Sequence, residues 1–139
     1  MTRISTFVYC EGVQNENTPK TVKNNIIGPM NVLRPMYIPG TFSFSIFVSI
    51  LGVDLNQDHN LRITFSYEES IIVDTGNSLL AAQKLESDLP ESERGFMLNM
   101  DLRNVVLKKE GSYKTSVYLD ENLLGEYPIY VKGIKNEYN

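Results

Sequence analysis

The chain has few of the residues that most often carry chemistry. It contains one cysteine, Cys10, one histidine, His59, and no tryptophan. A single cysteine excludes a disulfide within the chain, and one histidine with one cysteine cannot assemble a conventional structural zinc site. The sequence also has no glycine-rich phosphate loop, no GxSxG elbow, no HExxH and no CxxC. We therefore expect no cofactor and no catalytic residue, and we expect that the protein is not an enzyme.

Long apolar runs and basic clusters are missing as well. The longest apolar run, Ile46–Val53, is broken by Ser49 and Gly52 and is far shorter than the roughly 20 residues that cross a bilayer. The residues before Glu11 include too few apolar side chains for the core of a signal peptide. The net charge is −4 and the basic residues are scattered, which argues against nucleic acid as a ligand. These features predict a soluble, cytoplasmic protein that binds neither nucleic acid nor membranes.

What the chain does contain is strict alternation of apolar and small polar residues. It is clearest in Thr41–Val53, TFSFSIFVSILGV, where serines separate the apolar residues and Phe47 is the one large residue on the serine side. Alternation of this kind is typical of a half-buried β-strand, because successive side chains point to opposite faces. Leu61–Tyr67 alternates in the same way and is predicted to pair antiparallel with Thr41–Val53. Gly95–Leu107 alternates too, with a change of parity that predicts a bulge near Arg103-Asn104.

Turn-forming residues divide the remainder into short segments. Thr2–Cys10 is predicted to be the first strand, and the polar Glu11–Lys20 a loop or a loose hairpin connection. Short strands are expected at Lys23–Ile27 and Met30–Leu33, on either side of a kink at Gly28-Pro29. Ser78–Glu86 fits either a helical turn or two, or a short edge strand.

Together these segments predict an all-β chain of seven to nine short strands with at most one short helix. The expected architecture is a two-layer antiparallel β-sandwich, immunoglobulin-like or jelly-roll-like, with a closed barrel as the alternative. Residues 1–139 are predicted to form a single domain, with 133–139 as a polar tail.

A set of short motifs follows the same order as in a known group of proteins. The motifs are Tyr9-Cys10-Glu11, Lys20, Ile26-Ile27-Gly28-Pro29-Met30, Tyr37-Ile38-Pro39, the strand entry Asp58–Ile63, and the closing GSYKTSVYLDENLLGEYPIYV. In this order the chain resembles a small family of uncharacterised proteins from bacteria and their phages, although Glu11 stands where that family typically has Asp. The resemblance implies a β-sandwich and no assigned activity, so it implies no catalytic residues.

The loop Asp54–Asn60 begins like a calcium-binding loop. Asp54, Asn56 and Asp58 alternate as its first ligands do, but the sixth and twelfth positions are His59 and Phe65 instead of glycine and glutamate. The same residues are typical of a hairpin loop, and the sequence leaves a metal role for them open. His59 is expected to be solvated, and Cys10 to be a small core residue.

Acidic residues gather in the loop around Pro90, at Glu86, Asp88, Glu91 and Glu93. They could supply a carboxylate pair for hydrolysis, but a solvated loop that presents negative charge to a basic partner fits them better. Phe47, Tyr118 and Tyr130 lie on the opposite parity to the core residues of their strands. Exposed aromatic residues are favoured at protein interfaces, so these three are further candidates for partner binding.

The sequence therefore predicts a non-catalytic binding module whose partner is another protein, host or viral. The resemblance extends this to a phage-encoded accessory or modulator of a host protein. One alternative is a small-ligand or glycan site in the loops 54–60 and 87–94. Another is a self-assembling structural component that associates through an edge strand or the face that carries Phe47.

Overall fold

The computed structural model describes residues 1–19, 22–84 and 86–135. These three segments contain ten strands, one short 3-10 turn and no α-helix. In chain order the elements are β1 (Arg3–Asn17), β2 (Val22–Met30), β3 (Val32–Leu33), β4 (Gly40–Leu51), β5 (His59–Tyr67), β6 (Ser70–Asp74), β7 (Ser78–Leu80), η1 (Glu91–Glu93), β8 (Gly95–Leu107), β9 (Gly111–Leu119) and β10 (Asn122–Val131). No helix in the described segments is long and apolar enough to span a membrane.

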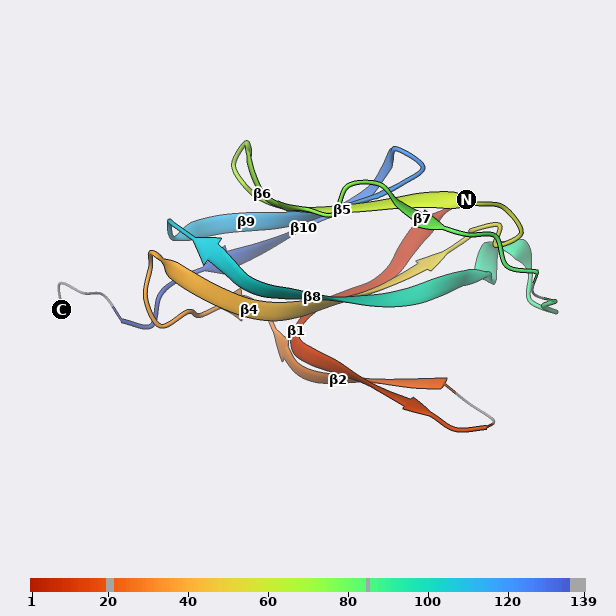
Figure 1. The fold of residues 1–139 in the computed structure, drawn as a ribbon, viewed down its shortest axis with the longest axis horizontal. Coiled ribbons are helices and arrows are strands. Elements are labelled where there is room, and N and C mark those ends of the chain that lie inside the picture. Colours follow the sequence, from red (N-terminus) through yellow and green to blue (C-terminus); the bar gives the residue numbers. More distant parts are fainter. Residues whose placement is uncertain (20–21, 85, 136–139) are drawn as a thin grey trace.

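The strands form two sheets that pack face to face (Figure 1). The first sheet has the order β2-β1-β4-β8, and the second has the order β3-β10-β9-β5-β6 with β7 also beside β5. All pairings are antiparallel except that of β3 with β10. The order β1-β4-β8 against β10-β9-β5 is the order A-B-E against G-F-C of the immunoglobulin sandwich. The predicted all-β antiparallel sandwich is confirmed, with ten strands instead of seven to nine.

Strand β4 lies inside the first sheet, and its apolar residues of one parity face the core, although Ser45 and Phe47 of the other parity are buried as well. Phe44, Ile46, Val48 and Ile50 are buried and point toward the second sheet. The ring of Phe44 lies 5.3 Å, between centroids, from that of Phe65 on β5, so aromatic packing joins the two layers. The core is therefore built by the residues whose parity the sequence identified.

The predicted pairing of the two most regular strands is wrong. Strand β4 pairs with β1 and β8, whereas β5 pairs with β6, β7 and β9 in the other sheet. The connection 52–58 carries the chain from one sheet to the other. Alternation shows which face of a strand is buried, but two strands with the same alternation can lie side by side or face each other.

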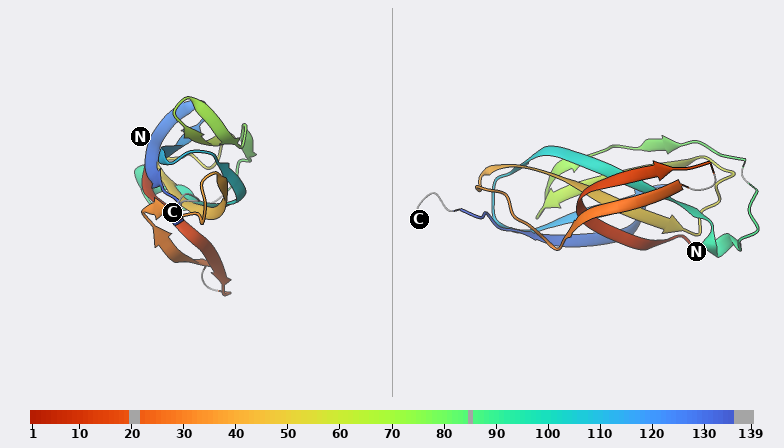
Figure 2. Two further views of the ribbon diagram at one scale, coloured as in Figure 1. Left: turned by 90° about the vertical axis from the view of Figure 1, so that its left-hand side faces the viewer. Right: turned by 90° about the horizontal axis from the view of Figure 1, so that it is seen from below.

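The loop expected at Glu11–Lys20 is wrong for residues 11–17, which are strand, whereas the alternative of a hairpin connection agrees with the antiparallel pairing of β1 with β2. Strand β1 continues to Asn17 and pairs with β2 from Tyr9↔Met30 to Asn17↔Val22, while its pairing with β4 ends at Cys10. The outer parts of β1 and β2 form an arm that projects away from the sandwich (Figures 1 and 2). None of residues 11–17 and 23–27 is buried, in keeping with the largely polar sequence of the arm. Lys20 lies outside the described residues.

Three smaller expectations have clear outcomes. The bulge at Arg103-Asn104 is confirmed, because the register between β4 and β8 shifts there and Asn104 has a φ of 53°. Ser78–Leu80 is a short edge strand, which decides between the two alternatives for that segment. The kink does not end β2, which runs through Gly28 at a φ of 60°. Of the predicted tail 133–139, residues 136–139 lie outside the described residues.

Candidate functional site

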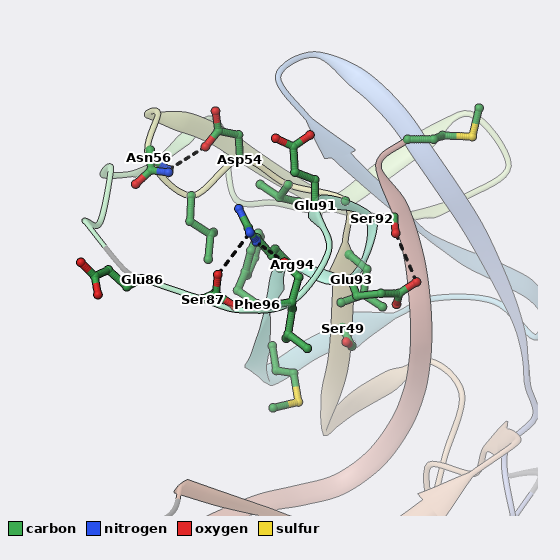
Figure 3. Close-up of a pocket in the computed structure, with 18 residues that line it drawn as sticks. Ser49, Asp54, Asn56, Glu86, Ser87, Glu91, Ser92, Glu93, Arg94 and Phe96 are labelled. Atoms are coloured by element: carbon green, nitrogen blue, oxygen red, sulfur yellow. Dashed lines mark hydrogen bonds between the residues drawn. The ribbon is translucent and has the colours of Figure 1, made fainter.

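A groove of about 880 Å³ lies at the end of the sandwich where β4 stops and β8 starts (Figure 3). Two loops form its walls, the connection 52–56 on one side and the acidic loop 86–94 on the other. The residues that line it are Met1, Ser49, Leu51, Gly52, Val53, Asp54, Leu55, Asn56, Glu86, Ser87, Leu89, Glu91, Ser92, Glu93, Arg94, Gly95, Phe96 and Met97. The structure thus brings together the two loops that the sequence proposed for a small-ligand site.

The base of the groove is a close approach of backbone to backbone. Leu51 pairs with Gly95, and the carbonyl of Arg94 accepts hydrogen bonds from the backbone N–H groups of Gly52 and Val53 at 2.8 and 3.0 Å. A Cβ atom on Gly95 would lie 1.8 Å from the carbonyl oxygen of Ile50, so only glycine fits. This contact fixes the two loops relative to each other.

Two arginines tie down the acidic loop. Arg94 donates from Nε to the carbonyl of Leu89 at 2.7 Å and from Nη2 to the carbonyl of Ser87 at 3.2 Å (Figure 3). Arg3, at the start of β1, donates to the carbonyl of Ser92 at 2.7 Å and to both carboxylate oxygens of Glu93 at 3.2 and 3.1 Å. The loop therefore has a defined shape although it is exposed, and the charge of Glu93 is paired.

The opposite wall is held by hydrogen bonds to backbone groups. Oδ1 of Asp54 accepts from the N–H of Asn56 at 3.0 Å, and Oδ1 of Asp58 accepts from the N–H of Ala82 at 2.7 Å. The N–H of Gln83 donates to the carbonyl of Leu55 at 2.8 Å. These contacts order a crossover between the two sheets and not the expected hairpin loop, because β4 and β5 lie in different sheets. Within the described segments, no three His, Cys, Asp or Glu side chains converge closely enough to hold a metal ion.

His59 is not solvated as predicted, because its side chain is only 12% exposed. Its Nδ1 lies 2.6 Å from Oδ2 of Asp120 and its Nε2 lies 2.6 Å from the carbonyl oxygen of Asp54. Both oxygens can only accept, so both hydrogen bonds form together only when both ring nitrogens carry a proton. The hydrogen bond to Asp120 raises the pKa of His59 above its ordinary value of 6.5. A protonated His59 thus anchors the Asp54 wall of the groove to the turn between β9 and β10.

The groove combines an apolar floor with an acidic rim. Leu89 and Met97 are 50% and 57% exposed there, beside Leu51, Leu55 and Phe96. Its lining includes four carboxylates, Asp54, Glu86, Glu91 and Glu93, against one guanidinium, Arg94. In the described part of the chain, Glu86 and Glu91 form no ion pair. The arrangement suits a ligand that is partly apolar and positively charged.

The predicted partner-binding residues fall into two groups. Glu86, Glu91 and Glu93 line the groove, and Asp88 is exposed in the same loop without lining it. The three aromatic candidates lie elsewhere in the two sheets. Phe47, on β4 of the first sheet, is 7% exposed and offers little surface to a partner.

The other two aromatic candidates are in the second sheet. Tyr118 on β9 is half-buried, with the guanidinium of Arg62 5.5 Å from its ring centre. Tyr130 on β10 is 51% exposed. The structure thus brings only the acidic candidates together in one site.

The apolar floor and the two arginine contacts were missed by the sequence reasoning. Arg94 directly follows the acidic residues in the sequence, and this is the one local signal that its side chain holds their loop in place. The floor depends on the register of β4 with β8, which no local pattern reveals.

Cys10 is fully buried and donates from Sγ to the carbonyl of Ser45 at 3.7 Å, whereas the ring nitrogens of His59 contact Asp120 and Asp54. Cys10 and His59 therefore do not form the cysteine–histidine pair that an activated thiol would need.

Comparison with known protein families gives one match. A family of unknown function (DUF6941) matches residues 5–132, which span both sheets and the groove. The chain belongs to this family. No curated protein matches it. Membership of DUF6941 agrees with the resemblance to an uncharacterised family and assigns no activity to the groove.

Proposed function

We propose that this DUF6941 protein is a non-catalytic binding module that holds a basic, partly apolar segment of a partner protein in the groove. The observation that carries the proposal is the acidic rim, in which Glu86 and Glu91 form no ion pair with any described residue, over the exposed apolar side chains of Leu89 and Met97. Opposite charge on the partner would steer the encounter, and the apolar floor would supply the contact area.

The rigidity of the groove supports binding over a purely structural role. Arg3 and Arg94 hold the acidic loop in place, and His59 holds the facing wall. Because the loops are already ordered, little conformational entropy is lost when a ligand enters. Met97 adds an adaptable surface, since methionine side chains adjust to irregular partners.

A small ligand is a second candidate for the same groove. Its volume of about 880 Å³ falls within the range of ligand pockets, roughly 300 to 1,000 Å³. A thermal-shift screen with calcium, nucleotides and sugars tests this reading, because a ligand that binds only the folded state raises the melting temperature. A shift that persists in a Glu86→Lys/Glu91→Lys variant would count against the groove as the site.

The setting in which such a module would work follows from the resemblance to bacterial and phage proteins. A cytoplasmic accessory protein that docks on a host protein and modulates it fits a small acidic sandwich. This part of the proposal rests on analogy with the family.

The experiment is affinity capture from a bacterial lysate, read by mass spectrometry, with three forms of the tagged protein. They are the wild type, the groove variant Glu86→Lys/Glu91→Lys, and the control Glu68→Lys/Glu69→Lys. The control makes the same change of net charge in the turn between β5 and β6. We expect one protein to be retained by the wild type and the control and lost from the groove variant. Retention of that protein by all three forms would exclude the groove as its binding site.

A further inference from the structure

Charge is separated along the long axis of the molecule. The end with the groove also holds the turn between β9 and β10, where the N–H of Asp120 donates to the carbonyl of Asn60 at 2.8 Å. This end carries acidic Asp54, Asp58, Glu86, Asp88, Glu91, Glu93, Asp120 and Glu121 against basic Arg3, Lys84 and Arg94. The opposite end carries basic Arg34, Lys108, Lys109, Lys132 and Lys135 against acidic Glu68, Glu69 and Glu110.

The basic end presents an exposed apolar knob, formed by residues 34–37 and 132–135. The two segments lie side by side, since the N–H groups of Ile134 and Lys135 donate to the carbonyls of Pro35 and Met36 at 2.8 and 3.0 Å. Met36, Tyr37 and Ile134 are 50%, 50% and 56% exposed. Arg34, Lys132 and Lys135 supply the charge of the knob, and Arg34 Nε donates to the carbonyl of Lys132 at 2.9 Å.

The knob and the groove are complementary in both charge and polarity. One is an apolar surface with basic residues around it, and the other is an apolar floor with an acidic rim. They lie at opposite ends of the long axis, so a knob cannot enter the groove of its own molecule (Figures 1 and 2). We infer that the groove receives the knob of a second copy, so that the protein assembles head to tail. This inference rests on the proposed function and names the partner.

An interface of this kind is heterologous, because the knob of one copy contacts the groove of the next. Repetition of such a contact gives open chains or closed rings, not a two-fold dimer. The contact also depends on exposed charges, so it weakens as salt screens them. We therefore expect oligomers that grow with protein concentration at low salt and shrink at high salt.

The experiment is sedimentation velocity over a wide range of protein concentration. The groove variant is Glu86→Lys/Glu91→Lys, and the knob variant is Lys132→Glu/Lys135→Glu. We expect each variant alone to lose self-association, with the dissociation constant raised at least about tenfold by like charges at the contact. Glu11→Lys/Glu16→Lys, on the arm, is the control that keeps wild-type behaviour.

A mixture of the two variants separates this arrangement from all others. The knob of the groove variant and the groove of the knob variant are both intact, and the reversed charges at the other contact, Lys in the groove against Glu on the knob, are again opposite. The mixture is therefore expected to regain the association that each variant alone has lost. Association regained in the mixture also shows that both variants are folded. A wild type that stays monomeric at every concentration would overturn the inference, as would self-association that survives in both variants. The proposed function would stand in either case if lysate capture still depended on Glu86 and Glu91.

Discussion

The hydroxyl of Tyr9 in the first sheet lies 2.7 Å from the hydroxyl of Thr115 in the second. The same Tyr9 hydroxyl lies 2.6 Å from the carbonyl oxygen of Tyr127, so it bridges β1 to both β9 and β10. Thr115 is 1% exposed and Tyr9 is 6% exposed. Burial raises the pKa of Tyr9 to about 12, so the hydroxyl keeps its proton over the ordinary pH range. Two hydrogen bonds of the Tyr9 hydroxyl thus join the two sheets across the core.

Removal of this hydroxyl is predicted to destabilise the sandwich. In Tyr9→Phe the buried Thr115 hydroxyl and the Tyr127 carbonyl lose their partner, at a cost of about 1–3 kcal/mol in the free energy of unfolding. Urea denaturation measures the difference, with the exposed Tyr130→Phe as the matched control that should change little. In a double-mutant cycle with Thr115→Val, the two losses should not add, because each removes the same hydrogen bond. Full additivity would show that the two hydroxyls are not coupled.

His59 and Asp120 are predicted to make stability depend on pH. The pKa of His59 is raised above 6.5 by the hydrogen bond to Asp120, so its contribution is fully present below pH 6.5 and is lost as pH rises through the folded pKa. The pKa of Asp120 is lowered below 3.8 by the hydrogen bond from His59, so its contribution is present above pH 3.8 and is lost as pH falls through the folded pKa. The pair therefore stabilises the fold most between those two values.

The variant His59→Gln tests this dependence. Because the Asp120 side chain is 43% exposed and solvent screens it, we expect a loss of about 1 kcal/mol near pH 6 that shrinks as pH rises. Chemical denaturation of both proteins at a series of pH values measures the difference. A loss that is equal at acidic and alkaline pH would mean that the charge of His59 contributes nothing.

Gly95→Ala is predicted to damage the base of the groove and the first sheet together. Its Cβ would lie 1.8 Å from the carbonyl oxygen of Ile50, so the β4–β8 pairing must open locally, at a cost of roughly 2 kcal/mol or more. Gly12→Ala is the control, because a Cβ there meets nothing within 4 Å. Thermal unfolding compares the two variants with the wild type. Equal melting temperatures for all three would contradict the close approach of the two strands.

Arg94→Met is predicted to loosen the acidic loop without unfolding the protein. The carbonyls of Leu89 and Ser87 lose their donors, but they lie in an exposed loop where water replaces the arginine. Hydrogen exchange read by mass spectrometry should show faster exchange in residues 86–94 and little change in the core strands. The control is Arg103→Met, since the Arg103 side chain is 77% exposed and its one ion pair among the described residues is a long contact of 3.7 Å with Asp101. Faster exchange throughout the sandwich would instead assign Arg94 a global role.

The sequence was a good guide wherever a property depends on neighbouring residues. The serines of β4 identify its outer face, and the parity change after Leu102 identifies the bulge at Asn104, because both follow from the two-residue period of a strand. The arm formed by the outer parts of β1 and β2 is a case in which the local sequence pattern did not predict the strands. Its polar residues resemble a loop, yet they form a regular hairpin because backbone hydrogen bonds between β1 and β2 need no apolar side chains.

The chain by itself determined an all-β sandwich, the buried faces of its main strands and an acidic loop, since alternation and turn residues are local properties. Only the tertiary structure decided that β4 lies beside β8 and opposite β5, which builds the groove where Leu51 meets Gly95. It also decided that His59 meets Asp120, 61 residues further along the chain, which raises the pKa of His59. Strand partners are chosen by packing over the whole core, so contacts between distant segments leave no local pattern to read.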